Sequence, residues 1–324
     1  MNQIVRYFNT LLLGCGLCWI PLNAAHADGA ADSIRVTALL AEAAALPKSE
    51  NKILFFAEGF LGTPYEGGTL ETFPVERLVV RTDAVDCTTF VEYVLALMLT
   101  DKELSQQRSK NLKASCDAST QKTSCDASTQ KASCSSSTQG ISCGSSPYTL
   151  FKQKLTAIRY RGGQLHGYTS RLHYFSEWIT DNQRMGFVSE VTTQSPHTQR
   201  TVSLNFMTQH ASLYPFLAHD TLTLTAMQNV ERRFEDYTMH YIPKHQLTAG
   251  KDILKINDGD ILTLVTKITG LDVVHVGFAR WVNGQLHLLH ASSLAKRVLL
   301  DPSTLHQYTQ NKKTQIGIRV IRVL

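Results

Sequence analysis

The chain has 324 residues, of which 43% are hydrophobic and 18% are charged, and it carries a net charge of +5 at neutral pH. This composition is typical of a globular protein and excludes the disordered and fibrous classes. The positive charges are spread along the chain, so they do not indicate a nucleic-acid-binding protein.

The first 27 residues have the pattern of an export signal. Arg6 precedes the uncharged, mostly apolar stretch 11–22, and Ala25-His26-Ala27 places small residues where a signal peptidase cleaves. We therefore predict a signal peptide at 1–27 and an exported protein, periplasmic or secreted. Leu12-Leu13-Gly14-Cys15 weakly resembles a lipoprotein box, so lipid anchoring is the less favoured alternative. No later segment is long and apolar enough to predict a membrane span.

Helices are predicted for most of the first hundred residues. Apolar residues recur at helical spacing over 32–60, and Pro47 divides them into two short amphipathic helices. A turn-rich loop follows at 62–68. A further helix with a wide apolar face is predicted from Cys87 to about Asp101.

Residues 113–148 form a nonapeptide repeat. The unit KASCDASTQ starts at Lys113 and recurs closely at Lys122 and loosely at Lys131. Ser, Thr and Gln dominate, so the segment cannot bury enough apolar surface to offset its ordering entropy, and we predict a disordered surface insertion. The repeat contains four cysteines: Cys116, Cys125, Cys134 and Cys143. Their wide spacing is unlike that of most zinc sites, so metal binding or cross-linking is the alternative.

The remainder of the chain changes from helical to β-rich. A helix is predicted from Tyr148 to Ile158, a broken strand over 186–204, and helices on either side of Pro215. Strands are predicted at Ile261–Thr266, Val273–Val282, Gln285–Ala291 and Ile316–Val323.

Asn283-Gly284 predicts a two-residue type I′ turn between two of these strands. In that register Val282 pairs with Gln285. Because side chains alternate along a strand, His275 and His290 then share one face as diagonal neighbours, with β-carbons roughly 7 Å apart or less. The turn alone therefore predicts that two imidazoles meet.

Cys87 stands apart from the other cysteines, because Cys15 and Cys18 lie in the predicted signal and four lie in the repeat. An odd number in an exported protein leaves at least one thiol unpaired. A cysteine at a helix N-terminus is placed where the macrodipole and free amides stabilise a thiolate. We predict a Cys-His-His set in which Cys87 attacks an amide carbonyl, His275 activates the thiol and protonates the leaving amine, and His290 orients His275.

Five short motifs resemble, in order, those of the NlpC-type murein amidohydrolases, which are papain-like cysteine hydrolases of bacterial cell walls. They are Gly62-Thr63-Pro64-Tyr65-Glu66-Gly67-Gly68, Asp86-Cys87-Thr88, Gly259-Asp260-Ile261, His275-Val276-Gly277-Phe278 and Leu289-His290-Ala291-Ser292. The stretches 160–163 and 168–175 lie in a long central insertion and resemble the muramoyl-L-alanine amidase-like branch. The sequence departs from the superfamily at Thr88-Thr89, where serine-glycine is usual.

The resemblance implies an α+β fold of papain-like, NlpC type. In this fold the nucleophile helix packs on a C-terminal antiparallel sheet that carries both histidines. It implies one catalytic domain over 28–324 with Cys87, His275 and His290 as the catalytic set. It also implies hydrolysis of the amide between N-acetylmuramic acid and L-alanine, in peptidoglycan or muropeptides.

Other residues are candidates for substrate binding or for structural roles. Tyr65 matches a loop tyrosine that the resemblance places near the thiol, with packing as its alternative. Arg171 is a candidate for binding a peptide or lactyl carboxylate, with a structural salt bridge as the alternative. Tyr174 is a candidate for the wall of a sugar-binding cleft, although core packing is favoured. Asp86 is expected to cap the Cys87 helix.

Three other functions are kept open. The first is a γ-D-glutamyl-diamino acid endopeptidase of the same superfamily. The second is a zinc amidase using His275, His290, His287 and an acidic residue, although His287 lies on the opposite hairpin face. The third is a non-catalytic wall-binding module. We expect no cofactor, no metal and no nucleic-acid partner, and the oligomeric state stays open.

Overall fold

The computed structural model describes residues 29–120 and 145–324, with the side chains of 111–120 left out of the description. The predicted signal at 1–27 and most of the repeat therefore lie outside the described residues. Within the described ranges, no helix combines the length and apolarity needed to cross a membrane.

The described chain folds into helices and strands in an order that is mostly helical first and mostly β last. The helices are α2 (Gly29–Ala45), α3 (Lys52–Glu58), α4 (Cys87–Thr120), α5 (Pro147–Arg159), α6 (Phe175–Arg184), α7 (Phe206–Gln209), α8 (Pro215–His219), α9 (Thr221–Arg232), α10 (Lys251–Leu254) and α11 (Leu305–Gln310). The strands are β1 (Val188–Glu190), β2 (Thr198–Val202), β3 (Tyr237–Pro243), β4 (Ile261–Thr266), β5 (Val273–Val282), β6 (Gln285–Ser292), β7 (Arg297–Thr304) and β8 (Gln315–Val323).

The strands form one eight-stranded antiparallel sheet. Its order is β2-β3-β8-β4-β5-β6-β7, and β1 joins it through β8. The predicted mixture of helices and an antiparallel sheet is confirmed, and β4 and β5 have the predicted bounds. The sequence did not predict β3 or β7. β7 contains Asp301 and Pro302, which usually interrupt strands. The proline is tolerated because β7 lies at the edge of the sheet.

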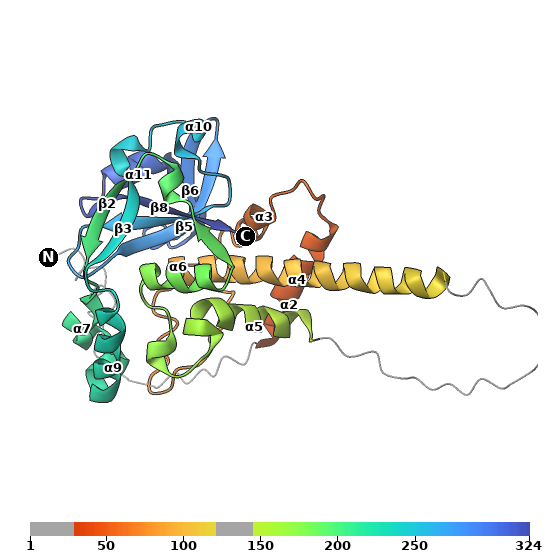
Figure 1. Cartoon of the computed structure of the whole chain (residues 1–324), viewed down its shortest axis with the longest axis horizontal. Helices are drawn as coiled ribbons and strands as arrows, with labels where there is room; N and C mark the ends of the chain where they lie inside the picture. The colour runs from red at the N-terminus through yellow and green to blue at the C-terminus, as the bar shows by residue number, and fades with distance from the viewer. Residues whose placement is uncertain (1–28, 121–144) are drawn as a thin grey trace, which may run out of the picture.

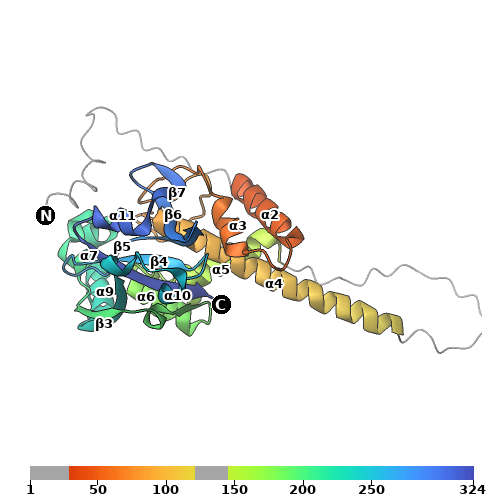
Figure 2. The same cartoon turned by 90° about the horizontal axis from the view of Figure 1, so that it is seen from above.

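Helices cover both faces of this sheet (Figures 1 and 2). On one face α2 to α6 enclose the largest core cluster, which includes Phe90 of α4, Trp178 of α6 and Phe278 of β5. On the other face Leu264 of β4 and Leu305 of α11 belong to a separate cluster. The central sheet is thus buried on two sides, while α7 to α9 form a third cluster at one end.

Helix α4 is longer than predicted. It runs for 34 residues to Thr120 instead of ending near Asp101 (Figure 1). No glycine or proline occurs between these two positions, and Lys, Gln, Arg, Leu and Ala all favour helix. Residues 113–120 were predicted to belong to a disordered insertion, and they are helical instead. Residues 121–144 lie outside the described residues.

A buried ion pair joins α4 to α5. Arg159 Nε lies 2.6 Å from Glu92 Oε2, and the two side chains are 1% and 2% exposed. Arg159 Nη1 also donates to the carbonyl oxygen of Val79 at 2.7 Å. This pair ties the helix that begins with Cys87 to the helix that follows the repeat.

We predict that Glu92→Ala destabilises the protein by about 3–5 kcal/mol, because it leaves the Arg159 charge buried without a partner. Urea unfolding followed by circular dichroism measures the change. Glu103→Ala, which breaks the more exposed pair between Glu103 and Lys154, is the control and should cost less than about 1 kcal/mol. Equal losses in the two variants would contradict the prediction.

Candidate active site

Cys87 is the first residue of α4, and Asp86 caps this helix as expected. Asp86 Oδ1 accepts hydrogen bonds from the Thr89 amide at 2.7 Å and from the Thr89 hydroxyl at 2.8 Å. The Asp86 amide in turn donates to Thr89 Oγ1 at 2.9 Å. This reciprocal cap holds the first turn of α4 in place, so the position of the thiol is set by the helix start.

The two histidines meet as the hairpin predicted. Asn283 and Gly284 have φ values of 50° and 77°, which a type I′ turn requires, and Val282 pairs with Gln285. His275 Nε2 lies 2.6 Å from His290 Nδ1, and the two rings meet edge to face with centroids 4.8 Å apart. The predicted register and the shared face are confirmed.

The thiol and the imidazoles approach the sheet from different sides. His275 and His290 lie beside Tyr308 of α11, with ring centroids 6.3 and 5.5 Å from it. Val276, the next residue along β5, faces the α4 side and belongs to its core cluster. The backbone amide of Val276 lies close enough to the Cys87 thiol to lower its pKa. The Cys87 sulfur therefore lies next to β5, beside the residue that follows His275.

Asp301 of β7 is a further residue of this site that sequence reasoning missed. Its Oδ2 lies 3.4 Å from His290 Nε2, on the side of that ring opposite His275. Burial opposes ionisation of Asp301, but the nearby His290 ring and the hydrogen bond from the Ser303 amide outweigh it and hold the carboxyl pKa below its usual value. Because β7 was not predicted from the sequence, nothing in the sequence indicated that this carboxylate lies at the site.

Electrostatics keep both members of the expected thiol–imidazole pair neutral. Burial raises the pKa of the Cys87 thiol to about 12, and the negative charge of Asp86 adds to this, although the Val276 amide opposes it. Burial also lowers the pKa of His275 well below its usual value, and the neighbouring His290 and the positive charge of Lys312 add to this. The helix N-terminus was expected to stabilise a thiolate, but here desolvation is the larger effect.

Tyr65 lies beside the thiol. Its backbone amide donates to the carbonyl oxygen of Lys296 at 2.9 Å, which anchors the loop next to β7. Burial raises the pKa of the Tyr65 hydroxyl, and the neighbouring Cys87 and Asp86 raise it further. The phenol is therefore a protonated donor near Cys87.

Arg171 and Tyr174 lie in buried networks. Arg171 is 6% exposed, with Nη2 2.7 Å from Glu71 and Nε 3.2 Å from Glu76. Tyr174 is 2% exposed, and its hydroxyl donates to Glu231 at 2.7 Å. The structure thus brings His275 into contact with His290 and places Tyr65 near Cys87. Arg171 forms the salt bridge that was its alternative, and Tyr174 lies in the core, as was favoured.

His287 lies on the other hairpin face, as the register predicted. Its Nδ1 donates to the backbone carbonyl of Asp301 at 3.0 Å. Among the described side chains, no group of three or more His, Cys, Asp and Glu is arranged to hold a metal ion.

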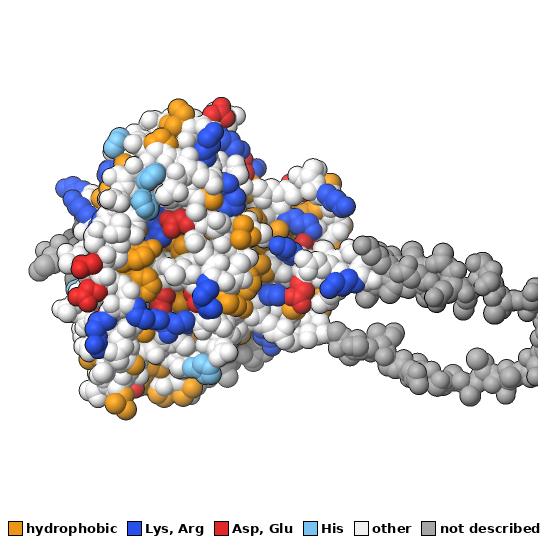
Figure 3. Space-filling model, in the orientation of Figure 1, with side chains coloured by type: hydrophobic (Ala, Val, Ile, Leu, Met, Phe, Trp, Pro, Cys, Tyr) orange, Lys and Arg blue, Asp and Glu red, His pale blue; other side chains and the backbone are white. Residues whose placement is uncertain are grey.

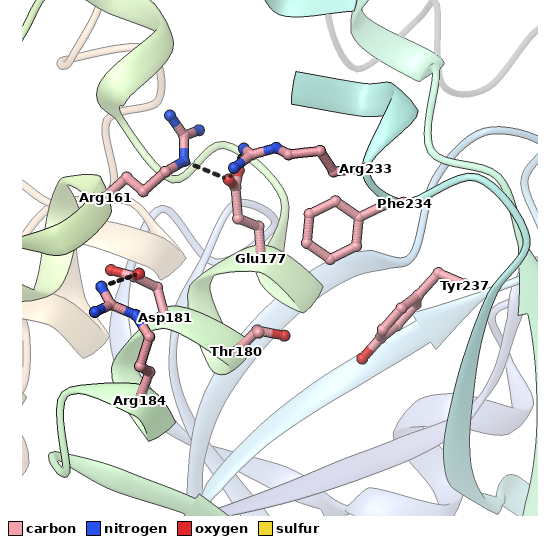
Figure 4. Close-up of a pocket in the computed structure, with 8 residues that line it drawn as sticks. All are labelled: Arg161, Glu177, Thr180, Asp181, Arg184, Arg233, Phe234 and Tyr237. Atoms are coloured by element: carbon pink, nitrogen blue, oxygen red, sulfur yellow. Dashed lines mark hydrogen bonds and ion pairs between the residues drawn. The ribbon is translucent and has the colours of Figure 1, made fainter. Parts of the chain in front are cut away.

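A pocket that none of these residues lines is drawn in Figure 4. It has a volume of about 320 Å³ and lies between α6, the end of α9 and β3. Arg161 and Arg233 converge on Glu177, and Arg184 pairs with Asp181. Its charges largely satisfy one another, and none of the predicted site residues lines it. On the face drawn in Figure 3, basic side chains are interspersed with acidic and apolar ones.

Known proteins resemble this chain in sequence and in structure. A family model described as AmiA-like, N-acetylmuramoyl-L-alanine amidase-like, matches residues 55–116 and 124–318. An N-acetylmuramoyl-L-alanine amidase from Bacteroides uniformis is 34% identical, with 84% of this chain and 97% of that chain covered and a TM-score of 0.67. No curated protein matches the sequence.

Two other solved structures are similar. A protein from Bacteroides fragilis whose name suggests a xylanase is 35% identical, covering 83% of this chain and 99% of its own, with a TM-score of 0.66. A protein from Legionella pneumophila is 19% identical, covering 93% and 97% of the two chains, with a TM-score of 0.59. At that identity the Legionella structure supports the fold alone.

We predict that alkylation of Cys87 by iodoacetamide accelerates about tenfold per pH unit from about pH 7 to 9, because the thiolate fraction grows tenfold per unit below a pKa of about 12. Peptide mapping by mass spectrometry measures modification at Cys87 separately from the other cysteines. A free model thiol is the reference and should level off near its own pKa of about 8.5. A rate at Cys87 that is independent of pH would show a thiolate and contradict the prediction.

Proposed function

The chain belongs to the AmiA-like, N-acetylmuramoyl-L-alanine amidase-like family, and from this membership we propose that it cleaves the amide between N-acetylmuramic acid and L-alanine with the thiol of Cys87. Family membership supports a cell-wall hydrolase of the amidase-like kind. The observation that supports the thiol mechanism is the 2.6 Å contact between His275 Nε2 and His290 Nδ1. His275 directly precedes Val276, whose backbone amide lies near the Cys87 sulfur. The papain-like, NlpC-type affiliation is part of the proposal.

In the first half-reaction Cys87 acts as the nucleophile. His275 Nε2 is occupied by His290, so Nδ1 is the nitrogen that takes the thiol proton. The sulfur bonds to the lactyl carbonyl carbon, and the Cys87 backbone amide helps to stabilise the oxyanion. The C–N bond then breaks, and His275 gives the proton to the departing amino group of L-alanine. The products are a free peptide and a thioester between Cys87 and the sugar.

In the second half-reaction water replaces the peptide. His275 Nδ1 removes a proton from water, the hydroxide bonds to the thioester carbon, and the C–S bond breaks. The sulfur recovers the proton from His275, and the sugar leaves with a free lactyl carboxylate. Because thiol and imidazole are neutral at rest, His275 works as a general base and not as half of a preformed ion pair.

We assign substrate contacts mainly to Tyr65. Its protonated hydroxyl lies near Cys87 and is able to donate to the carbonyl or the peptide at the scissile bond. Arg171 already has Glu71 and Glu76 as partners, and Tyr174 is occupied by Glu231. In this proposal both residues have a structural role and do not contact the substrate.

We further propose that the protein is exported and that residues 28–324 act as a single catalytic domain. The sequence of 1–27 supports a signal peptide, and the family acts on the cell wall, which lies outside the cytoplasm. Lipid anchoring at Cys15 is the less favoured form of this proposal.

We predict that Cys87→Ser lowers kcat/KM more than about 1,000-fold, because a serine hydroxyl is a much weaker nucleophile with this base. Chromatography with mass spectrometry on a defined muropeptide measures turnover, and circular dichroism checks folding. Cys116→Ser, which changes a cysteine of the repeat, is the matched control and should leave turnover unchanged. An active Cys87→Ser protein would refute the thiol mechanism and leave a binding module or another hydrolase to be considered.

Product analysis separates the proposed reaction from its alternatives. We expect a sugar with a free lactyl carboxylate together with an intact peptide that begins with L-alanine. A sugar that keeps a shortened peptide would instead indicate the γ-D-glutamyl-diamino acid endopeptidase. Loss of activity with a chelator, but not with a thiol alkylator, would indicate the zinc amidase.

A further inference from the structure

Strand β7 contains an irregularity next to the two histidines. His287 pairs with Thr304 and Leu289 pairs with Leu300, so three residues of β7 lie opposite one residue of β6. The three residues are Asp301, Pro302 and Ser303. Proline has no amide hydrogen for the ladder, and such bulges re-aim side chains beside functional sites. The bulge turns Asp301 toward the face on which His290 lies.

The bulge holds Asp301 at three points. Its backbone carbonyl accepts from His287 Nδ1 at 3.0 Å. Its Oδ1 accepts from the Ser303 amide at 2.8 Å, and its Oδ2 lies 3.4 Å from His290 Nε2. The backbone and Oδ1 are fixed by neighbours on β6 and β7, so Oδ2 alone is directed at the His290 ring, whose side chain is 1% exposed.

The proton positions follow from this arrangement. An ionised carboxylate only accepts hydrogen bonds, so it favours a proton on His290 Nε2. A neutral His290 then has a bare Nδ1, which accepts from His275 Nε2 across the 2.6 Å contact. A neutral His275 with its proton on Nε2 has a bare Nδ1. The chain of contacts thus determines which nitrogen of His275 is able to take a proton.

We propose that Asp301 is a positioning residue that keeps the proton of His290 on Nε2 and so leaves His275 Nδ1 free as the base. The inference rests on the proposed function, in which His275 is that base. The 3.4 Å separation is within ion-pair range and longer than an optimal hydrogen bond. Its attraction therefore grows when the imidazoles take up the thiol proton during the reaction.

Other charged and polar groups surround the same rings. Lys312, after α11, places positive charge near His275 and disfavours its protonation, whereas Asp301 favours it. Tyr308 of α11 packs against both rings, and the thiol approaches from the α4 side. Asp301 is the negative group among these that reaches His290, so the direction of the proton chain depends on it.

Asp301→Asn tests the proposal, because the Ser303 amide controls how the new side chain is oriented. The asparagine oxygen keeps the hydrogen bond at the Oδ1 position, which places its NH₂ group opposite His290 Nε2. Two donors would then face each other, so His290 moves its proton to Nδ1 and donates to His275 Nε2. A neutral His275 then carries its proton on Nδ1, the nitrogen that the reaction needs bare.

We expect nitrogen NMR of histidine-labelled protein to show Nε2 protons on both rings in the unmodified chain and Nδ1 protons in Asp301→Asn. We expect kcat to fall about 1,000-fold, as for a wrong tautomer in a triad, with little change in KM. Asp301→Glu, which restores a carboxylate, should recover the Nε2 tautomers and part of kcat. Asp220→Asn is the matched control, since Asp220 caps α9 through hydrogen bonds to the Leu222 amide and the Thr223 hydroxyl.

Unchanged tautomers in Asp301→Asn, or a proton on His275 Nδ1 in the unmodified chain, would overturn this inference. The NMR result does not depend on turnover, so it is separate from the fate of the proposed function. If Cys87→Ser stays active while Asp301→Asn shifts the protons, the thiol mechanism fails and the role of Asp301 in the proton chain stands. If Cys87→Ser is inactive and the protons do not shift, only the role of Asp301 fails.

Discussion

His275 Nε2 and His290 Nδ1 lie 2.6 Å apart. Two ring nitrogens stay this close only when one donates a hydrogen bond and the other accepts it, because two donors or two lone pairs repel. Everything else in the candidate site is arranged around this condition between His275 and His290. The type I′ turn sets the register that makes the rings neighbours, and the β7 bulge brings a carboxylate to the far side of His290. The contact therefore links three strands into one polar unit within the sheet.

The sheet places this unit where a helix start reaches it from the opposite face. Helix α4 packs its apolar side on the face that carries Val276 and Phe278, while α11 covers the histidine side. The cap formed by Asp86 and Thr89 fixes the first turn of α4, so the sulfur meets the backbone of β5 at Val276. A helix and a hairpin thus supply the proposed nucleophile and the proposed base from separate layers of the fold.

Burial explains why the resting site is neutral. Desolvation raises the pKa of Cys87 and lowers that of His275, and both shifts remove charge from a region of low polarity. Several charged side chains in the protein interior are paired, as Arg159 is with Glu92 and Arg171 is with Glu71 and Glu76. In the proposed mechanism, charge separation in the site therefore arises only during the reaction, and the thiol needs a base that is correctly oriented in advance.

The sequence by itself determined what depends on near neighbours in the chain. It predicted the β4 and β5 strands, the cap at Asp86 and the meeting of His275 with His290, because a two-residue turn and an alternating pattern act over a few residues. Tertiary structure alone decided the long-range partners. Asp301 reaches His290 through a bulge in a strand that its own residues do not favour, and Arg171 finds Glu71 and Glu76 some hundred residues away in the chain. Such contacts depend on how separate elements pack, and no local pattern of residues encodes that packing.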